Sequence, residues 1–165
     1  MKKMLLATAL GLTLALASSA AAQTVNFNRH GFSLWIPDRY RAKVTNNNDR
    51  KDFGYSYGTS GYGSINISVQ SNREEYSTFQ REKGFRNSRW RSNPIDTQRF
   101  SVDHYYEGDI AVYRVRENGK TFIKALSMVG LDNKKLVTVE YSAPDIDNGR
   151  NHSDIYDIMG SMRCR

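Results

Sequence analysis

The sequence has little cysteine and little proline, and its one long apolar run lies at the very beginning. A single cysteine, Cys164, cannot form a disulfide within the chain, which excludes a disulfide-stapled secreted scaffold. Three prolines and 12 glycines in 165 residues exclude collagen-like and proline-rich polymers. Ten tyrosines, seven phenylalanines and two tryptophans supply enough aromatic surface for a hydrophobic core, so we expect an ordered chain and one domain.

The first 22 residues have the pattern of a cleaved secretory signal peptide. Lys2 and Lys3 precede an apolar stretch over 4–17, and small residues follow up to Ala20-x-Ala22. The apolar stretch is shorter than the ~20 residues that a membrane-spanning helix needs. No cysteine follows it, so a lipobox is missing. We therefore expect a periplasmic or secreted protein with no transmembrane anchor after cleavage and one globular domain over 23–165.

Basic residues are concentrated in one segment. Between Arg81 and Arg99 six basic residues stand against two acidic ones, whereas the rest of the mature chain is nearly neutral. Guanidinium groups fork onto phosphate, sulfate or carboxylate oxygens, and a neighbouring tryptophan can stack on a sugar. The alternative is a solvated loop with its tryptophan in the core. The predicted anion- or partner-binding surface consists of Arg86, Arg89, Trp90 and Arg91.

A second candidate is the segment 53–63, which is rich in tyrosine, glycine and serine. Binding loops favour this mixture, because tyrosine offers a large contact area at a low entropy cost. The same pattern also fits a hairpin whose tyrosines pack on a sheet. The secondary binding hairpin would use Tyr55, Tyr57 and Tyr62.

Alternation of apolar and polar residues predicts strands over 32–36, 53–57, 64–70, 100–106, 111–115, 121–129 and 137–141. We expect turns at 58–61 and 107–109, and Asn118-Gly119 is a strong type I′ hairpin signal. Ser71 and Glu74 have capping-box spacing ahead of a central helix over 72–83. Ile155, Ile158, Met159 and Met162 have the spacing of a C-terminal helix. The predicted class is α+β, with an antiparallel sheet of about six to seven strands flanked by the two helices.

The opening segment Gly31-Phe32-Ser33-Leu34-Trp35-Ile36-Pro37-Asp38 and this element order resemble the PsbP-like fold. PsbP extrinsic proteins of photosystem II, a nuclear Ran-binding protein and DcrB-type envelope proteins share that fold. The resemblance spans about 25–163 and implies an antiparallel sheet between helices. It implies no single function, because these proteins serve as assembly factors, binding modules and chaperones.

The sequence contains no recognisable catalytic or metal-binding motif. His30, His104 and His152 stand outside any hydrolase or zinc pattern, and we expect no cofactor. The leading hypothesis is a monomeric, non-enzymatic binding or accessory protein of the cell envelope. Its partner would be an anionic glycan, a lipid headgroup or an acidic protein face, and no nucleic acid is expected. The alternatives are an exported hydrolase with carboxylate or histidine chemistry and an inhibitor or immunity-type protein.

Overall fold

The structure is a computed structural model that describes residues 22–71, 93–103, 106–131, 134–146 and 150–165. The expected signal peptide, apart from its last residue, lies outside these ranges. The same holds for the predicted helix over 72–83 and for the predicted binding residues Arg86, Arg89, Trp90 and Arg91. These expectations therefore stay predictions.

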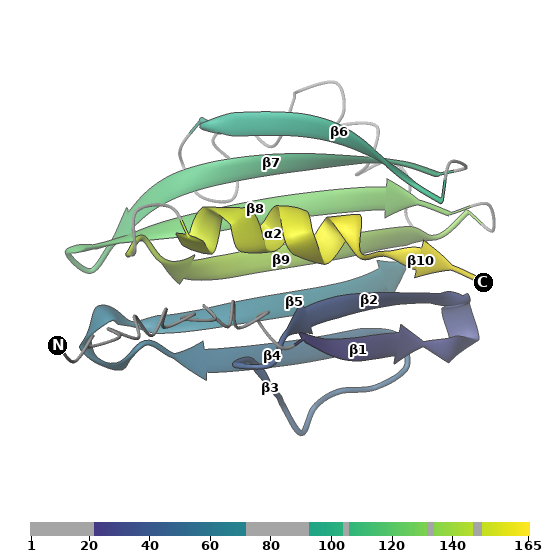
Figure 1. The fold of residues 1–165 in the computed structure, drawn as a ribbon, viewed down its shortest axis with the longest axis horizontal. Helices are drawn as coiled ribbons and strands as arrows, with labels where there is room; N and C mark the ends of the chain where they lie inside the picture. Colours follow the sequence, from purple (N-terminus) through teal and green to yellow (C-terminus); the bar gives the residue numbers. More distant parts are fainter. Residues whose placement is uncertain (1–21, 72–92, 104–105, 132–133, 147–149) are drawn as a thin grey trace, which may run out of the picture.

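Two antiparallel sheets and one α-helix make up the described chain (Figure 1). The large sheet has seven strands, in the spatial order β3 (Arg41–Ala42), β4 (Arg50–Ser56), β5 (Tyr62–Gln70), β9 (Leu136–Pro144), β8 (Lys120–Gly130), β7 (Tyr106–Glu117) and β6 (Asp96–Val102). The small sheet has the order β1 (Ala22–Phe27), β2 (Phe32–Pro37) and β10 (Arg163–Cys164). The helices are α2 (Arg150–Gly160) and the short 3-10 turns η1 (Asn28–His30) and η2 (Gly58–Ser60).

The α+β class and the seven-stranded sheet agree with the sequence prediction, but the prediction that all strands form one sheet was wrong. Residues 32–37 do not join the large sheet; they form the centre of a second sheet between β1 and β10. This sheet was missed because β1 begins where the signal-peptide pattern ends and β10 has only two residues. Cys164 is half-buried in β10 opposite Phe32.

The predicted turn at 107–109 was also wrong. Residues 106–109 already belong to β7, and the chain turns earlier, next to Asp103, which has a positive φ of 49°. Gly108 instead lies opposite Phe100 in the middle of the β6–β7 pair. A Cβ at Gly108 would overlap the Phe100 ring, so this glycine makes room for an aromatic side chain rather than for a turn.

Other local predictions were confirmed. Asn118 and Gly119 connect β7 to β8 with φ values of 49° and 77°, as a type I′ turn requires. Strand β8 is buried on both faces, which matches its nearly continuous apolar sequence. The spacing that predicted the last helix places Ile155, Ile158 and Met159 in the core.

The main core lies between the large sheet and a second layer formed by the small sheet and α2 (Figure 1). The opposite face of the large sheet, here called the outer face, is divided into two halves. Over β7 and β8 it carries a second buried apolar cluster that includes Tyr113, Leu126 and Met128. Over β4 and β5 it is polar. Among the described residues, no helix is long and apolar enough to cross a membrane.

Candidate binding site on the outer sheet face

The polar half of the outer face forms a cleft of about 430 Å³, here called the outer-face cleft. Strand alternation brings its side chains together, because every second residue of adjacent antiparallel strands lies on the same face. One row across β4, β5 and β9 consists of Asp52, Asn66 and Glu140. The next row consists of Arg50, Ser68 and Thr138. Lys43, Ser64 and Gln70 complete the polar lining.

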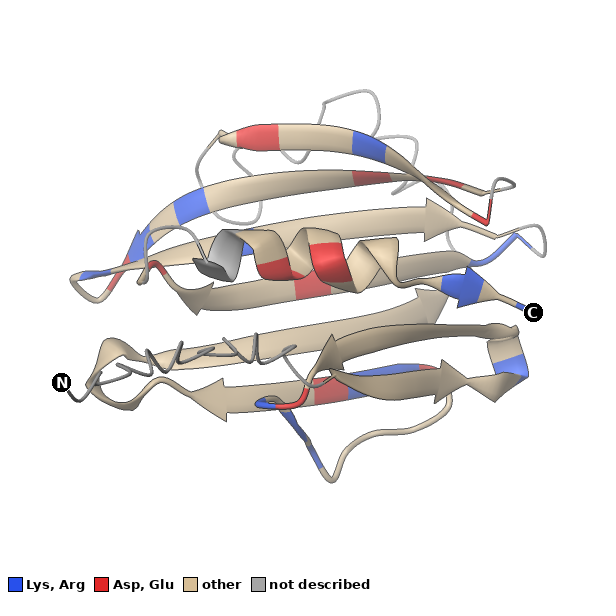
Figure 2. Cartoon of the chain, in the orientation of Figure 1, with Lys and Arg blue, Asp and Glu red and all other residues tan. Residues whose placement is uncertain are grey.

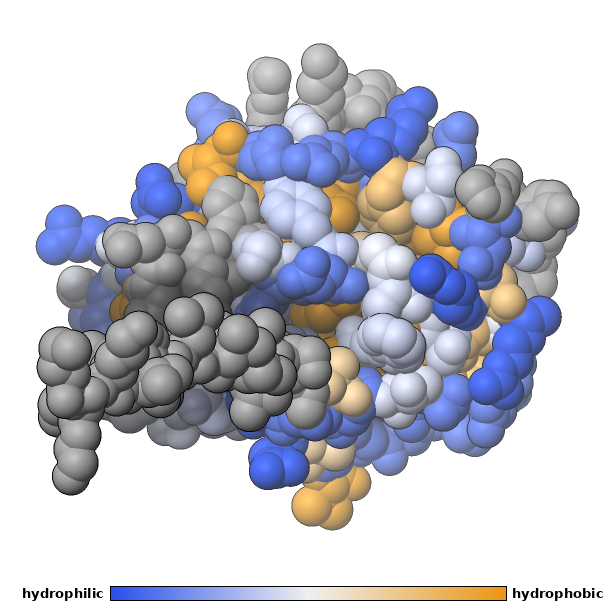
Figure 3. Space-filling model, viewed as in Figure 1, coloured by the Kyte–Doolittle hydropathy of each residue, from blue (hydrophilic) through white to orange (hydrophobic). Residues whose placement is uncertain are grey.

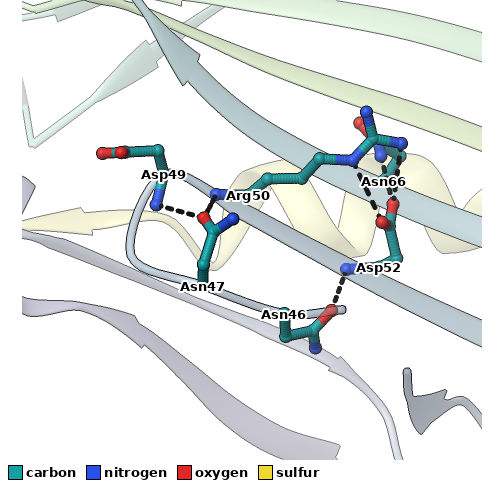
Figure 4. Close-up of polar contacts among 6 residues, drawn as sticks. All are labelled: Asn46, Asn47, Asp49, Arg50, Asp52 and Asn66. Atoms are coloured by element: carbon teal, nitrogen blue, oxygen red, sulfur yellow. Dashed lines mark hydrogen bonds and ion pairs between the residues drawn. The ribbon is translucent and has the colours of Figure 1, made fainter. Parts of the chain in front are cut away.

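Asp52 is the centre of the hydrogen bonding in this cleft (Figure 4). Its two carboxylate oxygens accept a forked pair of bonds from Arg50, with Nε 3.0 Å and Nη2 3.3 Å away, and Asn66 Nδ2 donates a further bond. Burial by itself raises the pKa of Asp52, but the bonds from Arg50 and Asn66 outweigh it and hold that pKa below its ordinary value. The hydrogen bond that Arg50 donates to Asp52 in turn raises the pKa of Arg50. Asp52 is therefore ionised and fixed in position.

Two asparagines hold the loop that precedes β4 (Figure 4). Asn47 Oδ1 accepts bonds from the backbone N–H groups of Asp49 and Arg50, both at 2.8 Å, and Asn46 Oδ1 accepts one from Asp52 N at 2.6 Å. Asparagine side chains stabilise turns in this way, because they replace the backbone acceptors that a turn lacks. The loop thereby fixes the start of the strand that carries Arg50 and Asp52.

Thr138 lies in the wall of the outer-face cleft with an unsatisfied hydroxyl. The residue is only 3% exposed, and its Oγ1 has no hydrogen-bond partner among the described residues. A buried hydroxyl without a partner costs free energy, and such groups are rare in folded proteins. The fold therefore leaves one hydrogen-bonding group in the cleft wall without a partner, and a bound molecule would reach it only by displacing the atoms that cover it.

Tyr62 lies in β5 two residues before Ser64, and therefore on the same face of the sheet as the lining of the outer-face cleft. Its ring lies over Gly54 of β4, so closely that any Cβ at position 54 would overlap the phenol. Lys43 Nζ lies 5.7 Å from the ring centroid, and the tyrosine remains 51% exposed. Gly54 thus allows an aromatic ring to lie along the sheet beside the cleft.

The three tyrosines of the predicted binding hairpin do not share one surface. Tyr55 and Tyr57 are half-buried and pack against the main core, with their rings edge-to-face at 4.7 Å. Tyr57 Oη also lies 3.0 Å from Tyr40 Oη. Only Tyr62 faces outward, so the structure separates it from the other two.

A buried polar network lies on the inner side, below α2. Arg39 Nη2 and Tyr141 Oη both donate to Asp154 Oδ2, the latter at 3.0 Å. Burial alone would lower the pKa of Arg39, but the hydrogen bond to Asp154 outweighs it and the pKa is raised. Burial raises the pKa values of Tyr40 and Tyr141 above their ordinary range. These groups keep one protonation state at neutral pH, which suits a structural role.

A separate pocket of about 280 Å³ surrounds His30 near η1. The imidazole is almost fully buried, with Nε2 2.7 Å from Asp49 Oδ1 and Nδ1 2.9 Å from Lys135 Nζ. A lysine only donates, so His30 Nδ1 accepts and Nε2–H donates to the carboxylate. The bond from His30 lowers the pKa of Asp49. His30 is therefore a buried neutral histidine that ties η1 to the starts of β4 and β9.

No pattern in the sequence indicated the outer-face cleft. Ser64, Asn66 and Ser68 alternate with isoleucines, which is the ordinary pattern of a strand with one solvent-exposed face. Thr138 is equally ordinary in a strand. What makes these residues a candidate site is the pairing of β5 with β9, which lie far apart in the sequence.

No protein-family model and no curated protein sequence matches the chain. Solved structures do match. LpqN of Mycobacterium tuberculosis, described as involved in cell envelope biogenesis, has a TM-score of 0.55 at 12% identity over 87% of this chain and 90% of its own. The Ran-binding protein Mog1p of Saccharomyces cerevisiae has a TM-score of 0.50 at 7% identity over 88% and 96%.

A Bacteroides thetaiotaomicron protein matches 82% of this chain with a TM-score of 0.53 and 11% identity, but this chain spans only 45% of its length. At such identities the matches establish the fold alone. The expected likeness to a Ran-binding protein and to an envelope protein is present at this coarse level. The more specific relationship to PsbP and DcrB-type proteins stays a prediction. The chain thus has a fold that an envelope protein and a Ran-binding protein also adopt.

Proposed function

We propose that the chain is an exported binding or accessory protein of the cell envelope that holds a glycan in its outer-face cleft. Acidic groups of the same glycan would bind the predicted basic surface of Arg86, Arg89, Trp90 and Arg91. The observation that carries the proposal is a cleft lined by amides, hydroxyls and paired charges, in whose wall the hydroxyl of Thr138 lacks a partner among the described residues.

The charge of the cleft favours a hydroxyl-rich ligand over an ion. Lys43 and Arg50 balance Asp52 and Glu140, so the described lining of the cleft has no net formal charge. Sugar hydroxyls both donate and accept hydrogen bonds, and could therefore use the carboxylate, amide and hydroxyl groups together. Groups already fixed by the fold, such as Asp52, lose little entropy when a ligand binds.

Tyr62 provides the apolar contact that such a site needs. Its exposed ring lies beside the cleft and is held against Gly54, so stacking on the apolar face of a sugar ring would cost little side-chain entropy. The proposal therefore retains the predicted binding role of Tyr62 and gives no such role to Tyr55 and Tyr57.

The electrostatics of Asp52 do not suit the general acid of a hydrolase. A carboxylate that acts as a general acid needs a raised pKa, whereas the pKa of Asp52 is lowered by Arg50 and Asn66. An ionised, fixed Asp52 suits the acceptor of a hydroxyl hydrogen bond. Release of reducing sugar from a bound glycan would instead support the hydrolase alternative.

The envelope location draws on two observations. The first 22 residues have the pattern of a signal peptide, which supports export. LpqN, which shares the fold, is described as involved in cell envelope biogenesis. The ligand itself is inferred from the cleft and not from LpqN.

The proposal is tested by binding of purified protein to an array of neutral and acidic oligosaccharides. Thr138→Val keeps the shape of the side chain but removes the hydroxyl, and we expect it to weaken binding about threefold to tenfold. Thr97→Val, on exposed β6, is the matched control and should bind like the wild type. Retention of an acidic protein and of no glycan would contradict the proposal.

The contribution of the basic surface to glycan affinity can be separated from that of the cleft by varying the salt concentration. Replacing Arg86, Arg89 and Arg91 with glutamate should remove the part of the affinity that falls with ionic strength, because exposed charges are screened. The contribution of the cleft should persist at high salt. Unchanged binding by this triple variant would limit the site to the cleft.

A further inference from the structure

A third hollow lies on the opposite side of the molecule, where β2 runs beside α2. It has a volume of about 240 Å³, and its walls include Trp35, Ile36, Pro37 and Ile158. Figure 3 shows this face, with hydrophobic residues visible between hydrophilic ones where the strand and the helix meet. Pockets for whole small molecules usually measure ~300–1,000 Å³, so this groove has room for one long side chain rather than for a cofactor.

Trp35 is the aromatic residue among the described residues that line this groove. It follows buried Leu34 and precedes buried Ile36 in β2, so alternation points its indole away from the core. The side chain is 57% exposed, the highest value among the aromatic residues that the structure describes. Its backbone N–H donates to Ser161 Oγ at 2.8 Å, which ties this strand to the end of α2. An exposed tryptophan on a rigid strand is typical of a binding hot spot.

The charges at the groove do not cancel. Asp154 is neutralised by Arg39 and accepts a further bond from Tyr141. Asp157, one turn further along α2, also lines the groove and is exposed. Its carboxylate makes no hydrogen bond or ion pair with any residue that the structure describes. From Ser153 to Gly160, helix α2 carries the acidic residues Asp154 and Asp157 and no lysine or arginine, as Figure 2 shows. The described residues that line the groove therefore carry a formal charge of −1.

The end of the helix adds to this negative charge. Asp157 and Ile158 lie in the last turn of α2, which ends at Gly160. Backbone carbonyl groups at a helix C-terminus carry partial negative charge and favour cations. A cation above the Trp35 ring would gain cation–π attraction as well. The apolar walls match the aliphatic stem of a lysine or arginine side chain.

We propose that the groove between Trp35 and Asp157 binds one basic side chain, arginine or lysine, of a partner polypeptide. The guanidinium or ammonium group would lie between the indole face and the Asp157 carboxylate, with its stem along Pro37 and Ile158. This interaction does not depend on the proposed glycan site, which lies on the other face of the large sheet. Binding of a basic side chain in this groove would mean that the proposed accessory protein has a protein partner as well as a glycan ligand.

The test is an NMR titration of the ¹⁵N-labelled protein with acetyl-Gly-Arg-Gly-amide. The sequence has two tryptophans, so the indole N–H region holds two signals, and Trp35→Phe identifies the one that reports on the groove. We expect the Trp35 signal to shift and to saturate. The same peptide with citrulline in place of arginine has nearly the same shape without the charge, and we expect it to bind at least about threefold more weakly.

Asp157→Asn tests the charge without changing the shape of the groove. We expect the variant to bind the arginine and citrulline peptides equally. Asp49→Asn, in the pocket around His30, removes a charge elsewhere and should leave the preference for arginine intact. An unchanged far-ultraviolet circular dichroism spectrum would show that α2 is still formed.

Three results would overturn the proposal. The first is a Trp35 signal that moves with neither peptide. The second is equal binding of arginine and citrulline by the wild type. The third is a preference for arginine that survives Asp157→Asn. In each case the exposed tryptophan would have a role other than holding a basic side chain.

Discussion

Thr138 shows how one atom separates a structural residue from a candidate binding residue. Threonine and valine have similar shapes, and both suit the middle of a strand. The hydroxyl of Thr138 is buried and has no hydrogen-bond partner among the described residues. It therefore contributes nothing to the fold that a methyl group would not contribute better.

Thr138→Val should accordingly stabilise the protein by about 1 kcal/mol, because the cost of burying an unpaired hydroxyl disappears. Urea unfolding at constant m-value measures this difference. Stabilisation together with weaker glycan binding is the signature of a binding residue. A loss of stability would show that the hydroxyl supports the fold.

The lowered pKa of Asp52 predicts that the stability of the fold depends on pH. Its folded-state pKa is lowered, so its contribution to stability is present above the unfolded pKa of about 3.9 and is lost as the pH falls through the lower, folded value. Asp52→Asn should therefore cost stability at neutral pH but progressively less below about pH 4. Acid unfolding monitored by fluorescence tests this, with Asp157→Asn as control. A difference independent of pH would contradict the account.

At the scale of elements, the β4–β5 hairpin positions the aromatic ring of the candidate site. Gly54 has no side chain, and the ring of Tyr62 occupies the space that a Cβ would need. The alternation of β4 and β5 was predictable from the sequence, but this contact between two positions in different strands was not, because it depends on the register.

Gly54→Ala should displace the Tyr62 ring and weaken glycan binding about as much as Tyr62→Ala does. The two effects should not add in the double variant, since both remove the same contact. In the Tyr62→Ala background, Gly54→Ala should even stabilise the strand slightly, because alanine loses less entropy than glycine. A binding array and urea unfolding of the four proteins check both points. Full additivity would contradict the contact.

Helix α2 depends on the ion pair beneath it. Arg39→Leu would leave Asp154, only 7% exposed, without its cation. Removing one partner of a buried pair costs about 3–5 kcal/mol, and the partial exposure of Arg39 places our expectation nearer 2–3 kcal/mol. Thermal unfolding followed by circular dichroism measures the loss. Arg39→Lys should retain part of the stability; a change below about 0.5 kcal/mol would contradict a structural role.

For the whole molecule, sequence patterns predicted most of the strands, the type I′ turn and the last helix, because these follow from local alternation and spacing. They did not predict the second sheet, since β10 pairs with β2 across almost the whole chain. Nor did they predict the outer-face cleft, because Thr138 and Asn66 approach each other only through the β5–β9 pairing. Long-range register thus decides both the architecture and the candidate site.

The most direct test of the central claim is chemical-shift mapping with a neutral oligosaccharide such as chitotriose. The account predicts that the largest amide and methyl shifts occur at Ser64, Asn66, Ser68, Tyr62 and Thr138, and that they disappear in Thr138→Val combined with Tyr62→Ala. Shifts confined to other surfaces, or none at saturating neutral and acidic oligosaccharides, would contradict the assignment of the outer-face cleft as a glycan site.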